Sequence, residues 1–258
     1  MAHVVEYLLR SKKKYQQSTR CGGNKLEKIR EGKTKTVFEA GDGNVLLRFK
    51  DDVTGEGDVV DPGANSIIGK VEGKGNASLR LSKYFFELLK REEIPSHYID
   101  AYIEDNTMLV RKAAPFGDGL EFICRRKAAG SYVRRYGRYI KEGTPLDYLV
   151  EVTLKDDERG DPLVNEDSLC QLGLMTAEEV EYAAGLTKKV TALVEKELER
   201  FGLEFIDIKF EFGRVDGKIV VIDEISGDNM RVKRNGKGVD QKELCSIVCG
   251  KKAYDENM

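Results

Sequence analysis

The chain has 258 residues, of which 40% are hydrophobic and 34% are charged. A chain of this length can bury a large core, as one domain or as two lobes, and its apolar fraction excludes an intrinsically disordered protein. Basic and acidic residues nearly balance at a net charge of −2, so an overall basic surface for nucleic acid or an anionic membrane is excluded and any anion site must be local.

Residues 1–24 are expected to form a short amphipathic helix and a polar linker, an N-terminal appendage. Its apolar stretch is too short, and too interrupted by Glu6, for a signal peptide. Three runs with near-alternating apolar positions follow at 25–32, 34–40 and 44–50, and they predict an antiparallel meander. Residues 51–76 are rich in glycine and charge and are expected to form a long functional loop.

In the next segments the apolar residues recur with the helical period of 3.6 in some stretches and with the strand period of two in others, in no regular order. We expect a helix at about 77–92, strands at 97–104, 107–113 and 121–128, and a helix at 130–137. The clearest helix is 175–201, where Thr176 and Glu179 form a predicted capping box. A hairpin at 203–226 follows. Because strands and helices do not alternate as βαβ units, we predict an α+β fold with mainly antiparallel sheets and flanking helices in two lobes, 25–112 and 113–258.

One face of the hairpin is dense in charged side chains that could bind a ligand or take part in catalysis. Alternation along its first strand places Asp207, Lys209 and Glu211 on one face. Asp223 lies on the returning strand, in an otherwise apolar run. Converging carboxylates would repel each other unless a cation joins them, and Mg²⁺ commonly uses one or two carboxylates together with nucleotide phosphates. The alternative is the exposed polar face of an ordinary amphipathic hairpin.

The turn decides whether Glu211 and Asp223 meet. A two-residue turn at Asp216 and Gly217 would place the two carboxylates on opposite faces of the hairpin. A three-residue loop with Gly217 in the left-handed conformation would place them on the same face. We therefore predict the bulged three-residue loop.

Three other stretches are candidate anion or loop sites. Residues 31–35, with Gly32 between charged residues and two lysines, suit phosphate binding, although they form no Walker motif. The small residues and arginines of 125–135 suit phosphate or carboxylate binding. Residues 155–166 are acidic and read as a loop. The alternatives are a solvated lysine pair, a solvated charge run and a plain turn.

The cysteines and the hydropathy pattern indicate in which cellular compartment the protein is expected. The five cysteines are scattered, odd in number and lack zinc spacing, which favours free thiols in a reducing compartment. No run approaches the roughly 20 apolar residues of a membrane-spanning helix. We therefore expect a cytoplasmic protein without membrane or nucleic-acid partners. The sequence does not decide the oligomeric state, and a homodimer stays open.

The order of motifs GKTK, FKDD, GKGNAS, RKAAGS, LKDDERGDPLVNE, IDIKFEFG and VIDEIS resembles the phosphoribosylaminoimidazole-succinocarboxamide synthase family over about residues 26–232. The resemblance implies a nucleotide fold similar to those of protein kinases and ATP-grasp enzymes. It also implies a ligase that uses ATP and Mg²⁺ to activate the carboxylate of a carboxyaminoimidazole ribotide as an acyl phosphate, which the amine of aspartate then attacks.

The resemblance implies roles for particular residues. The nucleotide-binding set is Lys33, Lys35, Val37, Arg111, Lys155, Glu211 and Asp223, with Glu211 and Asp223 as the magnesium ligands. The substrate-binding set is Arg125, Ser131, Arg135 and Arg231. The catalytic set is Lys35, Lys155, Asp58, Asp207 and Lys209. Asp52 is an alternative to Asp58, because the 51–58 loop is offset by one residue from the family pattern.

The chain departs from the family pattern on the acceptor side. Residues 226–233 lack the usual proline and Trp-Asp, and Arg126 stands where an asparagine is expected. Two alternatives to the purine ligase therefore stay open. One is a ligase of the same fold that joins a different carboxylate and amine, and the other is a nucleotide-binding paralogue without catalysis.

Overall fold

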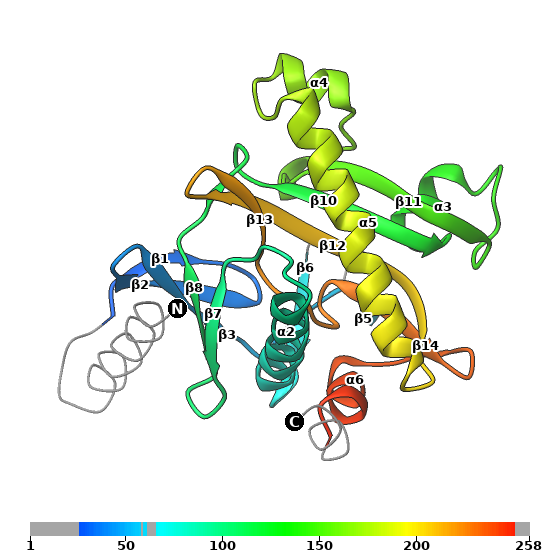
Figure 1. Ribbon diagram of the computed structural model, residues 1–258. Coiled ribbons are helices and arrows are strands. Elements are labelled where there is room, and N and C mark those ends of the chain that lie inside the picture. Colours follow the sequence, from blue (N-terminus) through cyan, green and yellow to red (C-terminus); the bar gives the residue numbers. More distant parts are fainter. Residues whose placement is uncertain (1–25, 58, 61–65, 251–258) are drawn as a thin grey trace.

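The computed structural model describes residues 26–57, 59–60 and 66–250 (Figure 1). The appendage expected at 1–24 lies outside the described residues, and so does Asp58. Within the described part, the ladders that join the strands are antiparallel and helices lie against the sheets, which confirms the α+β prediction.

The first sheet contains the predicted meander. Its strands are β1 (Lys28–Glu31), β2 (Lys35–Gly41), β3 (Asn44–Phe49), β7 (Tyr98–Tyr102) and β8 (Thr107–Arg111), in the order β1-β2-β3-β8-β7. Helix α2 (Lys74–Arg91) packs against this sheet, and Leu79 and Phe85 on the helix are fully buried. The helix begins a turn earlier than expected, because Asp51 accepts hydrogen bonds from the backbone N–H groups of Gly73 and Gly75.

The prediction of a long loop at 51–76 is wrong for most of that segment. Strands β4 (Asp52–Glu56), β5 (Val59–Val60) and β6 (Ser66–Lys70) form a small antiparallel sheet in the order β5-β4-β6. Val53 is buried, whereas the side chains of β6 are mostly exposed. Glycine and charge are tolerated on such an exposed sheet, so composition alone hides the strands.

The second sheet holds the rest of the strands. They are β9 (Ala114–Pro115), β10 (Leu120–Lys127), β11 (Pro145–Leu154), β12 (Glu204–Val215), β13 (Lys218–Ile222), β14 (Met230–Arg234) and β15 (Lys237–Gly238). The order is β11-β10-β12-β14-β15, with β13 and β9 also paired to β12. The long strand β12 is therefore central, and its polar face looks toward the clefts described below.

Helices cover the other side of the second sheet. The capping box of α5 (Ala177–Glu199) is confirmed, because Thr176 accepts from the Glu179 N–H and the Glu179 carboxylate accepts from the Thr176 N–H. Figure 1 shows α5 lying across β10 and β12, with α4 (Glu166–Gln171) near its start. Helix α6 (Gln241–Val248) packs on α2. The remaining short helices are α3 (Ser131–Tyr136) and the 3-10 turn η1 (Asp157–Arg159).

Two expectations about the setting can be compared with the described residues. Cys124, Cys170, Cys245 and Cys249 are free thiols, while Cys21 lies outside the described part of the chain. Among the helices that the structure describes, none combines the length and apolar character needed to cross a bilayer.

Candidate active site

Two adjoining clefts lie over the polar face of β12. The first cleft has a volume of about 520 Å³ and is lined by Lys33, Lys35, Val37, Lys155, Glu211 and Asp223, among others. The second cleft has a volume of about 310 Å³ and is lined by Arg125, Ser131, Arg134, Arg135, Asp207 and Arg231, among others. Glu121, Lys209 and Asn229 line both clefts. The predicted polar face of 207–211 thus runs through both clefts, with Asp207 in the second, Glu211 in the first and Lys209 on the floor that they share.

The predicted hairpin turn is wrong. β12 and β13 pair Glu211 with Ile222 and Val215 with Lys218, so the connection is a two-residue turn. Both of its residues are left-handed, with φ of 50° at Asp216 and 75° at Gly217. This geometry is that of a type I′ turn, whose twist matches that of the flanking strands. In a continuous ladder this register would turn the side chain of the residue after Ile222 away from Glu211.

The two carboxylates nevertheless share the first cleft. Strand β13 ends at Ile222, and Asp223 adopts a left-handed backbone with φ of 67°, which breaks the strand alternation. Glu211 and Asp223 therefore both line the cleft. The expected convergence is confirmed, but it comes from the backbone at Asp223 and not from a bulge in the turn.

Lysines compensate the buried carboxylates of the first cleft. Lys35 Nζ lies 2.9 Å from Asp223 Oδ1 and also forms an ion pair with Glu224. Lys155 forms an ion pair with Glu211. Burial opposes the charge on Lys35, yet the two neighbouring carboxylates raise the pKa of its ammonium above the ordinary value. This lysine therefore stays charged across the physiological range.

The pKa values of the two converging carboxylates are shifted in opposite directions. Burial would raise the pKa of Asp223, but the charges of Lys35 and Lys155 hold it at about 2. Burial and the charge of Asp223 raise the pKa of Glu211, because Lys155 compensates only in part. Two buried carboxylates that repel each other offer hard oxygen ligands to a divalent cation such as Mg²⁺. The donor set therefore fits this ion.

The described residues contain no group of three or more His, Cys, Asp or Glu side chains arranged to hold a metal. A site built on two protein carboxylates needs oxygens from another source to complete its shell, and nucleotide phosphates are the usual source for Mg²⁺. Lys33, at the rim of the same cleft, forms an ion pair of 2.6 Å with Asp157. The first cleft thus combines ammonium groups that could bind phosphates with carboxylates that could hold a metal ion.

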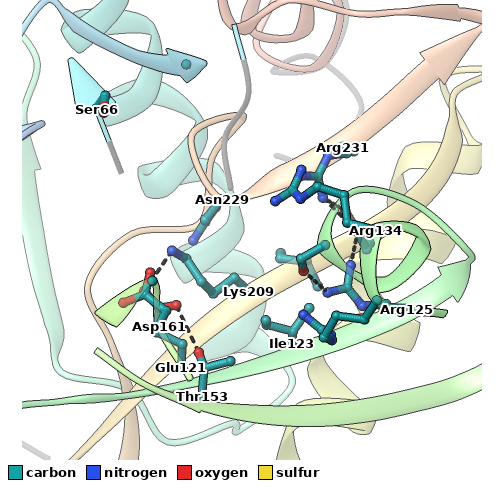
Figure 2. A pocket seen from close by; sticks show the side chains of 16 residues that line it. Ser66, Glu121, Ile123, Arg125, Arg134, Thr153, Asp161, Lys209, Asn229 and Arg231 are labelled. Atoms are coloured by element: carbon teal, nitrogen blue, oxygen red, sulfur yellow. Dashed lines mark hydrogen bonds and ion pairs between the residues drawn. The ribbon is translucent and has the colours of Figure 1, made fainter. Parts of the chain in front are cut away.

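The second cleft is organised by the register of three strands. Asp207 on β12 is the cross-strand neighbour of Arg125 on β10 and of Arg231 on β14. The Asp207 carboxylate accepts from Arg125 Nη1 at 2.7 Å and from Arg231 Nη1 at 2.8 Å. Figure 2 shows Arg125, Arg134 and Arg231 gathered at one end of this cleft. The sheet itself therefore builds a local cationic site on a nearly neutral protein.

Arg125 and Arg231 occupy different environments. Arg125 is 1% exposed, and besides Asp207 its guanidinium donates to Glu151 at 2.8 Å and to Ser131 Oγ at 2.9 Å. The side chain of Arg231 is 25% exposed. Gly130 has φ of 54°, and a Cβ there would lie 2.6 Å from Arg231 Nη2, so a side chain at this position would strain the backbone and displace the guanidinium. Arg125 is thus placed to orient its neighbours, whereas Arg231 faces the cleft.

Glu121 and Glu224 are site residues that the sequence analysis missed. Lys209 Nζ donates to Glu121 Oε1 at 2.7 Å, and Thr153 Oγ1 donates to Glu121 Oε2 at 3.2 Å (Figure 2). Burial raises the pKa of Glu224, which lies beside Lys35. Glu121 begins a strand predicted from apolar residues alone. Only the pairing of β10 with β12, which places Glu121 opposite Glu211, shows that Glu121 belongs to the site.

The other predicted residues lie as follows. Val37 lines the first cleft, and Arg135 lines the second, where it donates to Glu151 at 2.6 Å. Arg111 donates to the Ser96 carbonyl at 2.6 Å and is not among the residues lining the first cleft. Asp52 is buried beside Lys50, at 3.0 Å, and lines neither cleft. Asp58 lies outside the described residues.

Residues 28–244 match the family model of SAICAR synthetase. The chain belongs to the SAICAR synthetase family. A phosphoribosylaminoimidazole-succinocarboxamide synthase of Clostridium tetani is 53% identical over 222 residues, which cover 85% of this chain and 98% of that protein. The synthase of Sulfurisphaera tokodaii is 37% identical over 235 residues, covering 89% and 95%. The chain is therefore an ATP-dependent ligase of purine biosynthesis.

Solved structures of SAICAR synthetases share the fold. A type 2 SAICAR synthetase in complex with ADP has a TM-score of 0.74 at 30% identity, covering 88% of this chain and 94% of that one. The synthase of Ehrlichia chaffeensis has a TM-score of 0.75 at 26% identity, covering 89% and 96%. Of the functions that the sequence left open, these relatives favour the purine ligase. The altered segment 226–233 lies within the residues that match the family model.

Proposed function

We propose that the protein joins the amine of aspartate to the carboxylate of a carboxyaminoimidazole ribotide, with ATP and Mg²⁺ in the first cleft and the ribotide in the second. The observation that carries this proposal is the shared floor formed by Glu121, Lys209 and Asn229. A γ-phosphate and the carboxylate that attacks it must meet, and two clefts that open onto common residues allow that meeting.

The residues of the first cleft would bind and orient the triphosphate. Lys33, Lys35 and Lys155 supply positive charge against the phosphate oxygens, and phosphoryl transfer depends mainly on positioning and charge neutralisation. Glu211 and Asp223 would hold Mg²⁺, which when bound neutralises charge on the phosphates. When phosphates enter, Lys35 and Lys155 can exchange their carboxylate partners for phosphate oxygens.

The residues of the second cleft would hold the ribotide. Arg231, Arg135 and Ser131 present a guanidinium or hydroxyl group to its phosphate or carboxylate. Asp207 and the buried Arg125 keep these groups in place. A carboxylate oxygen of the ribotide attacks the γ-phosphorus, and ADP leaves. The aspartate amine then attacks the acyl carbon, and inorganic phosphate and a proton leave as the amide forms.

The remaining expectations extend this proposal. The substrates are small molecules, so we propose a cytoplasmic enzyme that acts without nucleic-acid or membrane partners. The division into lobes at about residue 112 and a homodimeric assembly stay predictions. Arg111 is proposed to support the nucleotide lobe through the Ser96 carbonyl, not to contact the nucleotide.

The proposal is tested with purified protein, MgATP, aspartate and the ribotide. ADP release is followed by a coupled assay and the amide product by mass spectrometry, against a panel of other acids and amines. Glu211→Gln and Asp223→Asn should each lower turnover by roughly a hundredfold or more while circular dichroism is unchanged. Asp216→Asn, at the turn of the same hairpin, is the matched control and should keep normal turnover. Absence of ADP release with the ribotide would reject the substrate assignment.

A further inference from the structure

The left-handed backbone of Asp223 is contacted by a buried histidine. His97 lies just before β7 and is 4% exposed. Its Nε2 lies 3.2 Å from the carbonyl oxygen of Asp223. Because a carbonyl oxygen only accepts hydrogen bonds, Nε2 must carry the hydrogen of the ring. His97 therefore donates to the residue whose backbone breaks the strand alternation.

The histidine is itself held by backbone contacts from both sheets. Its N–H donates to the Val221 carbonyl at 3.0 Å, and its own carbonyl accepts from the Arg111 N–H at 2.8 Å. The Val221 N–H donates to the Pro95 carbonyl at 3.0 Å. The segment 95–97 thus joins β8 of the first sheet to β13, two residues before Asp223.

The ring of His97 also has an aromatic neighbour on a helix. The His97 ring lies beside Phe86 of α2, with ring centroids 5.6 Å apart. The donor therefore reaches the Asp223 carbonyl from a rigid support that does not belong to the hairpin.

We propose that His97 is a positioning residue that holds Asp223 in the left-handed conformation and so keeps its carboxylate beside Glu211. The inference rests on the proposed metal role of these two carboxylates. A left-handed backbone is unfavourable for a residue other than glycine, so it needs support from its surroundings. Without the donor, Asp223 relaxes toward extended backbone, in which alternation turns its carboxylate away from Glu211.

The test compares variants that keep or lose the donor. His97→Gln keeps a side-chain N–H of similar reach, whereas His97→Leu keeps apolar volume without a donor, and His97→Met serves if the leucine variant does not fold. Phe86→Leu is the matched control, because it removes packing on the ring and leaves the donor. Binding of Mn²⁺ to the ADP complex is measured by electron paramagnetic resonance, and ADP affinity is measured separately with a chelator present.

Loss of the donor should weaken Mn²⁺ binding roughly tenfold, the usual effect of removing a group that orients a metal ligand, and leave metal-free ADP affinity unchanged. His97→Gln should restore most of the Mn²⁺ affinity, and Phe86→Leu should bind Mn²⁺ normally. Normal Mn²⁺ affinity in the donor-free variants, or equal weakening in Phe86→Leu, overturns the inference. Asp223→Asn separates the two claims. If it weakens Mn²⁺ binding and the donor-free variants do not, only the role of His97 is wrong; if Asp223→Asn binds Mn²⁺ normally, the metal site is wrong as well.

Discussion

Lys209 and Glu121 form an ion pair at the boundary of the two clefts, with Nζ 2.7 Å from Oε1. Lys209 is two residues along β12 from Glu211, the residue opposite Glu121, since the ladder pairs Glu121 with Glu211 and Ile123 with Lys209. The pair therefore bridges neighbouring strands diagonally. It fixes an ammonium group at the place where a phosphate and a carboxylate would meet.

Replacing Glu121 by glutamine should release Lys209 from this position. We expect turnover to fall by roughly a hundredfold, because small displacements of a positioning group have effects of that size. The KM for ATP should change much less. Steady-state kinetics with each substrate varied in turn measures both quantities. Thr153→Val removes only the 3.2 Å hydrogen bond to the same carboxylate and should have a smaller effect. Near-normal turnover in Glu121→Gln would contradict the role of the pair.

Arg231→Ala should weaken binding of the ribotide selectively. The guanidinium is partly exposed in the second cleft, and charge-assisted hydrogen bonds of this kind contribute about 1.5–3 kcal/mol. The KM for the ribotide should therefore rise by roughly ten- to a hundredfold, with the KM for ATP unchanged. Lys233→Ala, on the same strand but outside both clefts, is the control. A selective loss of ATP affinity would show that Arg231 serves the nucleotide.

Arg125→Met should destabilise the fold. The substitution leaves Asp207 and Glu151 without a buried partner, and breaking such a pair costs about 3–5 kcal/mol. Unfolding in urea, followed by circular dichroism, measures the free energy. Arg135→Met removes a more exposed partner of the same Glu151 and should cost less than about 1 kcal/mol. Equal costs for the two variants would mean that burial of Arg125 contributes little.

The stability of the metal-free protein should depend on His97 in mild acid. Burial lowers the pKa of the His97 imidazole to about 4, below the ordinary value of 6.5, so the unfolded chain binds more protons between these values. This contribution is fully present above pH 6.5 and is lost as pH falls toward 4. Between pH 7 and 5 the loss is roughly 2 kcal/mol.

The same measurement on His97→Gln isolates the contribution of the imidazole to the free energy of unfolding. The variant has no group that titrates at this position, so its free energy of unfolding should fall by roughly 2 kcal/mol less than that of the wild type between pH 7 and 5. Parallel pH profiles for the two proteins would mean that the imidazole keeps its ordinary pKa in the folded state.

The sequence by itself determined the features that depend on local periodicity. The meander of β1–β3, the capped helix α5 and the polar face of 207–211 follow from residues that are neighbours along one element. Side-chain direction within a strand or helix repeats with a fixed period, so one segment is enough to read it. The order of motifs also indicated the family, because it combines many such segments over most of the chain.

Only the tertiary structure decided how separate segments meet. The carboxylate of Asp223 joins Glu211 because β13 ends early and residues 95–97 support a left-handed backbone. The burial of Arg125 and the place of Glu121 follow from the pairing of β10 with β12. Register and support from distant segments are set by long-range packing, which leaves no periodic trace in either partner. The sequence therefore predicted many of the residues that line the two clefts but missed Glu121 and Glu224, and the pairing of strands determined how these residues are arranged.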